Sequence, residues 1–237
     1  MEKRAELYEG KAKKVFLTDD PELLIVEYKD DATAFNGLKK GVIAGKGVIN
    51  NKMSNLLMQM LENVGIPTHF VRELSDRETL VKRVDIVPLE VIIRNYAAGS
   101  FSKNYGVEEG VAFDSPTIEF SYKNDPLGDP LLNEHHAIAL KLVTPAEIET
   151  VKRYAFEINK QLKALWAECG VTLVDFKVEF GKQANGAIIL ADEISPDTCR
   201  LWDSKTGEKL DKDRFRRDLG GVEDAYAEVM KRLLEKI

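Results

Sequence analysis

Residues 171–182 read Val-Thr-Leu-Val-Asp-Phe-Lys-Val-Glu-Phe-Gly-Lys, and residues 187–193 read Ala-Ile-Ile-Leu-Ala-Asp-Glu. Between residues 174 and 180 apolar and charged side chains alternate strictly, which is the period of a strand with one apolar and one charged face. A polar turn from Gly181 to Gly186 joins the two segments, so the sequence predicts a β-hairpin. The charged face of its first strand carries Asp175, Lys177 and Glu179.

The return strand of this hairpin predicts where the charged face lies. Its apolar run, Ala187–Ala191, is typical of a strand that is buried on both faces. The charged side chains of the neighbouring strand are therefore expected to face a cleft and not open solvent. Acids that gather in a cleft need a cation, and the pair Asp192 and Glu193 adds two more.

Composition and length limit the classes of protein that remain. The chain has 237 residues, enough for one large domain or two modest ones, with 44% hydrophobic and 31% charged residues. Its net charge is −6 and its basic residues are interleaved with acids, so we expect no nucleic-acid partner. We expect no membrane partner either and a cytoplasmic location, because no apolar run approaches ~18 residues and the first residues are too charged for a signal peptide.

The remaining metal-binding residue types give no pattern of their own. Cys169 and Cys199 lack the spacing of metal ligands and are expected to be free thiols. The three histidines lack a zinc pattern as well.

The first 85 residues predict a mostly antiparallel sheet with one helix. Short strands flank a lysine-rich glycine turn, residues 10–14, which could cradle a polyphosphate or could simply be a solvated hairpin tip. A glycine-rich segment with three lysines, residues 33–47, could be a lid over anions or a floppy connection. An apolar stripe between Ile49 and Val64 then predicts a helix.

The second part of the chain predicts an anion site and two long helices. The apolar strand Leu89–Arg94 ends in a guanidinium, and Gly99-Ser100 follows closely, a combination that suits a phosphate. Residues 123–130 form a long polar segment, which in a compact domain indicates a function. A capping box at Thr144–Glu147 starts one helix, and residues 222–234 have the period of another.

Five stretches of this chain together resemble the signatures of the SAICAR synthetase family. The resemblance spans nearly the whole sequence, in the order expected for that family, and its length is that of a single-function bacterial form. The stretches are Leu7–Lys13, Val87–Ser100, Leu173–Gly181, Asp192–Asp203 and Asp211–Arg216.

The resemblance implies an ATP-dependent ligase of de novo purine synthesis that uses Mg²⁺. It would join the carboxylate of carboxyaminoimidazole ribotide to the amine of L-aspartate, giving SAICAR, ADP and phosphate. The implied fold is α+β, with mostly antiparallel sheets in two lobes and an ATP cleft between them. Residues 1–85 would form the nucleotide-binding lobe, and residues 86–237 would carry the ribotide site, the metal-binding hairpin and the terminal helix.

The resemblance also assigns roles to individual residues. At the ATP phosphates it implies Lys11, Ala12 and Lys13, and around the adenine Val15, Leu24, Lys82 and Ile86. Mg²⁺ would be held by Glu179 and Asp192. The ribotide phosphate would be bound by Arg94, Ser100 and Arg200, and the imidazole ribotide would be oriented by Asp175, Lys177 and Asp197. The candidate catalytic residues are Lys177, Asp175 and Lys123, the last near aspartate or the transferred phosphoryl group. Asn36 stands where some members carry Asp, so no acid role is assigned there.

Whether one ion can reach both Glu179 and Asp192 depends on the register of the hairpin. If residues 181–186 form the whole turn, Phe180 pairs with Ala187, and Glu179 lies roughly 13 Å from Asp192 at ~3.3 Å per residue. Mg²⁺ binds its oxygens at about 2.1 Å and cannot bridge that gap. We therefore expect either a bulge or longer turn that shifts the pairing, or two ions that divide the triphosphate between them.

Two other classes of function are compatible with the same residues. A kinase-type phosphotransferase would also use a lysine-glycine turn and late paired acids, and it would act on a hydroxyl without aspartate. A nucleotide-sensing module would bind without turnover. For any of these we expect a homo-oligomer, with a dimer as the first expectation.

Overall fold

The computed structural model describes residues 1–35 and 37–237, so Asn36, the loop position discussed above, lies outside the described residues. The helices are α1 (Lys46–Asn63), α2 (Gly99–Tyr105), α3 (Glu134–Ala139), α4 (Pro145–Glu168), α5 (Asp213–Arg216) and α6 (Val222–Leu234), with a 3-10 turn, η1 (Asp125–Leu127). The strands are β1 (Glu6–Glu9), β2 (Lys13–Leu17), β3 (Leu23–Tyr28), β4 (Asp31–Ala34), β5 (Lys39–Val42), β6 (Phe70–Glu73), β7 (Glu78–Lys82), β8 (Asp85–Ile86), β9 (Leu89–Tyr96), β10 (Ala112–Tyr122), β11 (Leu131–Leu132), β12 (Val171–Lys182), β13 (Ile188–Ala191) and β14 (Cys199–Asp203).

The first sheet has the order β1-β2-β3-β7-β6, and its strand pairs are antiparallel. Residues directly opposite each other in such a ladder share a face of the sheet. Lys13 pairs with Tyr28, and Val15 pairs with Val26. Lys13 and Val15 are therefore on one face, the face that Leu24 of β3 also occupies.

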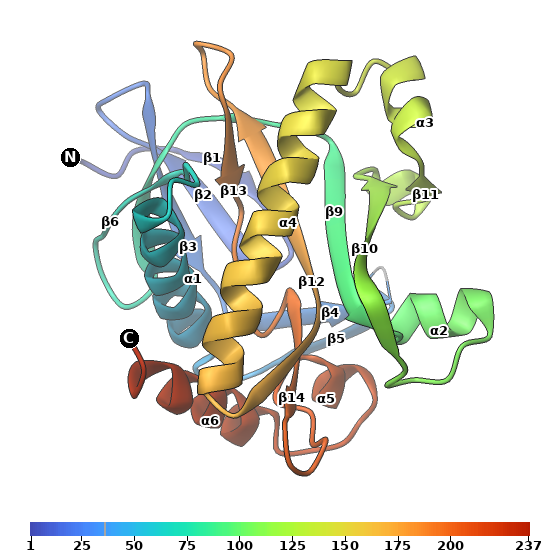
Figure 1. The fold of residues 1–237 in the computed structure, drawn as a ribbon. Helices are drawn as coiled ribbons and strands as arrows, with labels where there is room; N and C mark the ends of the chain where they lie inside the picture. Colours follow the sequence, from blue (N-terminus) through green and yellow to red (C-terminus); the bar gives the residue numbers. More distant parts are fainter. Residues whose placement is uncertain (36) are drawn as a thin grey trace.

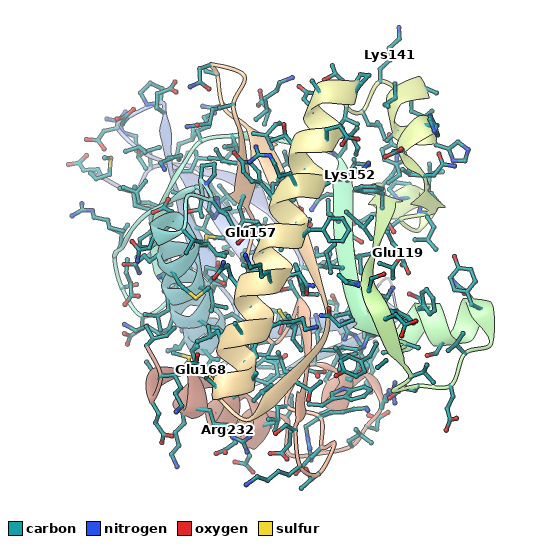
Figure 2. The ribbon with its side chains drawn as sticks, in the orientation of Figure 1. Glu119, Lys141, Lys152, Glu157, Glu168 and Arg232 are labelled. Carbon is teal, nitrogen blue, oxygen red and sulfur yellow. The ribbon has the colours of Figure 1, made fainter. Side chains whose placement is uncertain are left out.

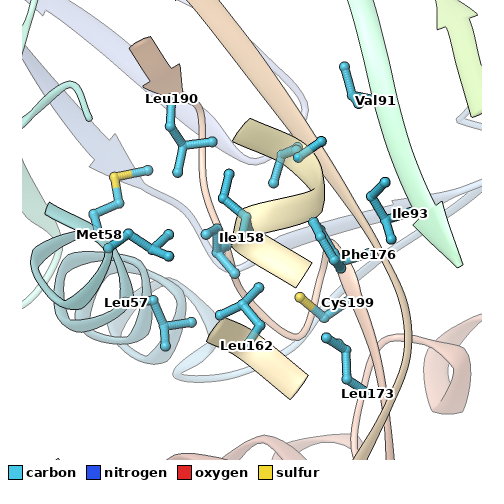
Figure 3. Close-up of a cluster of buried hydrophobic side chains, with 14 of the residues drawn as sticks. Leu57, Met58, Val91, Ile93, Ile158, Leu162, Leu173, Phe176, Leu190 and Cys199 are labelled. Atoms are coloured by element: carbon cyan, nitrogen blue, oxygen red, sulfur yellow. The ribbon is translucent and has the colours of Figure 1, made fainter. Parts of the chain in front are cut away.

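The second sheet has the order β11-β10-β9-β12-β13, with β8 and β14 also paired to β12. The long helix α4 lies along β12 and β9 on one face of this sheet (Figure 1). Its apolar side pairs with the apolar face of β12, so that Ile158 and Leu162 lie beside Phe176 in the core (Figure 3). The charged face of β12 consequently points away from α4, as the alternation predicts.

The predicted hairpin is formed by β12 and β13, but its simple register is wrong. Phe180 pairs with Leu190 and not with Ala187, and Lys182 pairs with Ile188, so β12 continues beyond Gly181. The turn is shorter than the sequence indicated and lies further along the chain, because Gln183 N donates to Ala187 O and leaves only residues 184–186 between them. The shifted pairing that we kept as an alternative is the one observed.

The segment between β13 and β14 makes a buried excursion, residues 192–198. Both strands pair with the same edge of β12, since Glu179 pairs with Ala191 and Phe176 pairs with Cys199. Three steps along β12 therefore correspond to eight along the other strand. The surplus residues leave the ladder and carry three acids, Asp192, Glu193 and Asp197, toward the charged face of β12.

The helices that the sequence predicts are confirmed, while several connections are more structured than expected. The capping box at Thr144 and Glu147 is present at the start of α4. In its described part the glycine-rich segment 33–47 is regular structure, because it contains most of the β4–β5 hairpin and the first two residues of α1, and its role as a lid stays a prediction. Residues 99–140 hold α2, β10, β11 and α3, which the apolar pattern does not indicate.

The two sheets divide the chain near the predicted lobe boundary, and α1 joins them. Along the chain, β7 is the last strand of the first sheet, and the next strand, β8, pairs with β12 of the second sheet. However, Met53, Leu57 and Leu61 of α1 belong to the same buried cluster as α4 and β12. The division into lobes 1–85 and 86–237 stays a prediction. Within the described residues, none of the helices combines the length and the apolar character required to cross a bilayer.

Candidate active site

Two arginines meet at one carboxylate on the charged face of β12. Asp175 pairs in register with Arg94 of β9 on one side and with Arg200 of β14 on the other. A bulge between Leu173 and Asp175 produces the second pairing, since without it Asp175 would lie opposite Cys199. Arg94 Nη1 donates to Asp175 Oδ2 at 2.6 Å, and Arg200 Nη1 donates to the same oxygen at 2.8 Å.

Further acids surround these arginines, and we call the group the arginine cluster. It comprises Arg94, Ser100, Glu119, Asp175, Arg200 and Asp213. Arg94 is buried, its Nε and Nη2 donate to Glu119 at 2.8 and 2.9 Å, and Nη2 also donates to Ser100 Oγ at 2.9 Å. Glu119 reaches it from β10, where Figure 2 labels it. Arg200 Nε donates to Asp213 at 2.9 Å.

The start of α2 lies against Arg200 because residue 99 is a glycine. Gly99 has a φ of +54°, and a Cβ there would lie 2.3 Å from Arg200 Nη2. Any side chain at this position would displace the guanidinium and would strain the backbone. Gly99 and Ser100 therefore bring the helix start next to both arginines, as the sequence predicts for an anion site.

A second group of charges follows further along β12, and we call it the lysine–acid cluster. It comprises Lys13, Glu90, Lys123, Lys177, Glu179, Asp192 and Glu193. Each oxygen of the buried Glu179 has its own lysine, Lys177 at 2.7 Å and Lys123 at 2.6 Å. Lys177 Nζ also lies 3.8 Å from Asp192 Oδ2. The two predicted metal ligands thus reach the same ammonium group, which the simple register would not allow.

The carboxylate of Asp192 reaches this cluster because its backbone leaves the strand. If β13 continued in the observed register, residue 192 would lie opposite Val178 and its side chain would be on the apolar face. Instead the backbone turns at Asp192, which has a φ of +58°. Asp is among the residues that tolerate this left-handed conformation. The turn directs its side chain to Lys13, to which it is hydrogen-bonded. Burial alone would raise the pKa of Asp192, but Lys13 and Lys177 hold it well below the usual range.

The two lysines of this cluster that face Asp192 remain charged. Burial disfavours the ammonium form of Lys177, yet Glu179, Asp192 and Glu90 outweigh it and raise its pKa. Lys13 behaves in the same way beside Asp192 and Glu193, and its Nζ lies 3.2 Å from Glu193. The cluster therefore holds ammonium groups beside carboxylates. The ammonium groups suit phosphate oxygens, and the carboxylates suit a metal ion.

A cleft of about 470 Å³ lies over the arginine cluster and over part of the lysine–acid cluster. Its lining does not include Lys13, Lys123, Glu179 or Asp192. From the predicted set it is lined by Lys11, Ala12, Arg94, Ser100, Asp175, Lys177, Asp197 and Arg200. From the remaining chain it is lined by Thr33, Ala34, Phe35, Gly37, Glu90, Ile92, Gly128, Asp129, Phe176, Glu193, Thr198, Cys199, Lys212 and Arg216. Elements of both sheets, the β4–β5 hairpin and the 124–129 loop therefore contribute to one site.

The residues expected around the adenine lie beside this cleft and do not line it. Val15 and Leu24 share the face of the first sheet that carries Lys13 toward Asp192. Lys82 is at the end of β7, where its Nζ donates to Thr68 O at 2.9 Å. Ile86 pairs with Gly181 of β12 and is 41% exposed. The structure thus brings them to the junction of the first sheet with β12 and β13.

Several residues with a place at the site were missed from the sequence. Lys212 and Arg216 lie in the charge-dense stretch 211–216, whose composition was a signal without an assigned role. Glu193 was seen as half of an acidic pair, but only Asp192 received a role. Lys46 was counted with the lysines of the glycine-rich segment, whereas it is buried and lies 2.9 Å from Asp197.

The donor set of the lysine–acid cluster fits Mg²⁺ bound together with phosphates. Glu179 and Asp192 offer carboxylate oxygens, which this ion prefers, and it commonly takes one or two carboxylates with substrate phosphates and water. Among the described residues no group of three or more His, Cys, Asp or Glu is placed to hold a metal. The described part of the chain therefore offers no metal site whose ligands all come from protein side chains.

Comparison with known proteins agrees with this geometry. The profile of the SAICAR synthetase family matches residues 6–233. The phosphoribosylaminoimidazole-succinocarboxamide synthase of Lachnoclostridium phytofermentans is 64% identical over 233 residues, which are 98% of this chain and 99% of that protein. The crystal structure of the synthase from Ehrlichia chaffeensis has a TM-score of 0.95 at 48% identity, with 98% of this chain and 99% of that chain covered.

A third comparison concerns the nucleotide. A SAICAR synthetase solved in complex with ADP has a TM-score of 0.93 at 47% identity, with 96% of this chain and 97% of that chain covered. These findings place the protein among the ligases and not with the kinase-type alternative. The chain belongs to the SAICAR synthetase family.

Proposed function

We propose that the chain catalyses the ATP-dependent joining of carboxyaminoimidazole ribotide and L-aspartate, a step of de novo purine synthesis that yields SAICAR, ADP and phosphate. The family profile and the names of its relatives support the reaction. The related structure in complex with ADP supports ATP as the nucleotide.

The observation that carries this proposal is the adjacency of the two clusters on one strand. Asp175 belongs to the arginine cluster, Lys177 to the lysine–acid cluster, and both lie on the same face of β12, about 7 Å apart as successive residues of that face. A phosphate bound among the arginines and a triphosphate bound among the lysines would thus place the acceptor carboxylate and the γ-phosphoryl group between them. Phosphoryl transfer needs this proximity more than any covalent help from the protein.

The residues can be given roles in two chemical steps. In the first, a carboxylate oxygen of the ribotide attacks the γ-phosphorus of ATP, and ADP leaves. In the second, the aspartate amine attacks the resulting acyl phosphate, loses a proton and expels phosphate. Lys13 and Lys177, with Lys11 and Lys123 nearer the surface, stabilise the charge on the phosphoryl oxygens. Asp175 and Asp197 orient the imidazole ribotide, while Arg94, Ser100 and Arg200 hold its phosphate.

We assign the remaining binding roles to the residues at the edges of the cleft. Glu179 and Asp192 would hold Mg²⁺, which when bound neutralises charge on the triphosphate. Val15, Leu24, Lys82 and Ile86 would contact the adenine, with Ala12 beside the phosphates. We also propose a homodimer in the cytoplasm, and sedimentation of the purified protein would test the dimer.

An isotope experiment tests the two-step chemistry. Ribotide labelled with ¹⁸O in its carboxylate is incubated with protein, ATP, Mg²⁺ and L-aspartate, and the phosphate released is analysed by mass spectrometry. The proposal predicts one ¹⁸O atom in each phosphate, because the carboxylate oxygen that attacks phosphorus leaves with it. Phosphate without ¹⁸O, formed together with the amide, would show that the carboxylate is not phosphorylated.

A further inference from the structure

A buried network behind the cleft fixes one of its carboxylates. Asp197 lies on the excursion 192–198 and lines the cleft. Behind it, Lys46 Nζ lies 2.9 Å from Oδ2 and Tyr226 donates its hydroxyl to Oδ1 at 2.7 Å. A third donor, Lys212, reaches Oδ2 at 3.3 Å and itself lines the cleft.

Local structure explains how Lys46 reaches this position. Asp30 accepts hydrogen bonds from the backbone N–H groups of Gly45 and Gly47 at 3.2 and 2.8 Å, which fixes the start of α1. Lys46 is in the first turn and points to the excursion. About two turns further along α1, Ser54 Oγ donates to Ile194 O at 3.1 Å. Helix α1 therefore contacts the excursion at two points, Asp197 and Ile194.

Neither Lys46 nor Tyr226 can touch a ligand in the cleft. The side chain of Lys46 has no exposed surface, and Tyr226 is fully buried in α6. A buried ammonium loses its hydration at a cost that its ion pair often does no more than offset, so burial of Lys46 beside Asp197 is not by itself explained by stability. Within the cleft, Lys46 and Tyr226 act only through the charge and orientation of the Asp197 carboxylate.

The network leaves Asp197 charged and with little acceptor capacity. A carboxylate has about four lone-pair positions. Lys46 and Lys212 occupy those of Oδ2, and Tyr226 takes one of Oδ1, so among the described residues one position on Oδ1 remains for a ligand. Burial alone would raise the pKa of Asp197, but Lys212 and Lys46 hold it well below the usual range.

We propose that Lys46 and Tyr226 are positioning residues that orient ionised Asp197 so that a single oxygen, Oδ1, accepts one N–H of the ribotide. This inference rests on the proposed function and deepens it. It predicts that loss of the Tyr226 hydroxyl frees Oδ1 to rotate or to bind water, which weakens the ribotide and leaves the nucleotide unaffected.

The test compares three variants of the full chain by steady-state kinetics and by calorimetric titration. Tyr226→Phe removes one hydroxyl and no packing, Lys46→Met removes the charge at similar length, and Tyr154→Phe is the matched control on α4, away from the cleft. We expect Tyr226→Phe to raise both KM and Kd for carboxyaminoimidazole ribotide about tenfold or more, as expected for one hydrogen bond to a charged group, with KM for ATP within twofold of wild type. Lys46→Met should shift the same constants further, and Tyr154→Phe should shift none.

The outcomes separate this inference from the proposed function. Tyr226→Phe that lowers the unfolding temperature and leaves both ribotide constants unchanged would show a merely structural network and overturn the inference. Equal rises in KM for ATP and ribotide would overturn it as well. If the wild-type protein neither binds nor turns over the ribotide, the proposed function fails first. If Lys46→Met does not fold, Tyr226→Phe still decides the matter.

Discussion

Arg94 donates to Oδ2 of Asp175 at 2.6 Å, across two directly paired strands. The same oxygen accepts from Arg200 at 2.8 Å. One carboxylate thus holds two guanidinium groups at the place where the sequence predicts a phosphate site. The two arginines differ in their other partners, because Arg94 also donates two hydrogen bonds to Glu119, whereas Arg200 donates one to Asp213. That difference gives the first prediction.

Replacement of each arginine by lysine should have unequal effects on folding. Arg94→Lys removes the paired hydrogen bonds of the guanidinium to Glu119 and should lower the free energy of unfolding by about 2–4 kcal/mol. It should also weaken binding of the ribotide. Arg200→Lys should change stability less and raise the ribotide KM at least tenfold, because Arg200 Nη2 makes no hydrogen bond to a described residue. Urea unfolding and steady-state kinetics measure both. If Arg94→Ala raised KM for ATP and left the ribotide KM unchanged, the assignment to the ribotide phosphate would be wrong.

Asp192→Asn tests the metal assignment. Asn has the same shape and also tolerates a φ of +58°, so the fold should persist. We expect turnover to fall at least a hundredfold and its Mg²⁺ dependence to weaken, because a charged oxygen ligand is lost. Asp125→Asn is the matched control, since Asp125 is exposed and pairs only with Lys11 among the described residues. Wild-type turnover of Asp192→Asn at ordinary magnesium would show that these acids do not hold a catalytic ion.

Lys11 and Lys13, both expected at the ATP phosphates, should not be equivalent. Lys13 lies between Asp192 and Glu193 and is mostly buried, whereas Lys11 is half-exposed and pairs with Asp125. Exposed pairs contribute little. Lys13→Met should therefore raise KM for ATP by tenfold or more and lower turnover, and Lys11→Met should raise KM for ATP only severalfold. Equal effects in the same ATP titration would mean that burial beside the acids does not distinguish them.

His69 gives the protein a predicted pH dependence of stability. Burial, and then the neighbouring Lys13, lower the pKa of His69 to about 4. The unfolded chain therefore binds more protons than the folded one between about pH 6.5 and 4, and stability is lost as pH falls through that window. Relative to His69→Gln, the free energy of unfolding should fall by about 1 kcal/mol for the first pH unit below 6.5. A difference that stays constant from pH 7 to 5 would mean that His69 titrates normally.

Local sequence signals predicted the parts of the fold that depend on neighbouring residues. The capping box at Thr144 and the apolar stripes of α1 and α6 are such signals, and each helix is where they indicate. The alternation from Val174 to Phe180 likewise predicts a face, because side-chain direction in a strand has a period of two.

Register and long-range pairing could not be predicted in this way. The bulge that sets Asp175 opposite Arg200 depends on how β14 packs, and the left-handed turn at Asp192 depends on where β13 ends. The three glycines that precede Lys46 in its segment suggest a loop. In the structure Gly45 and Gly47 donate to Asp30, and Lys46 contacts Asp197, so Lys46 lies in a buried helix start. A one-residue change of register reverses the face of every side chain, so such sites need the structure.

The most direct test of the central claim is ADP release by the purified protein with substrates omitted one at a time. With ATP, Mg²⁺, carboxyaminoimidazole ribotide and L-aspartate together, the account predicts sustained ADP release with one amide formed per ADP. Omission of the ribotide or of Mg²⁺ should abolish release, and without L-aspartate release should not be sustained. Vigorous ADP release with a sugar or protein hydroxyl as acceptor, and none with L-aspartate, would contradict the account.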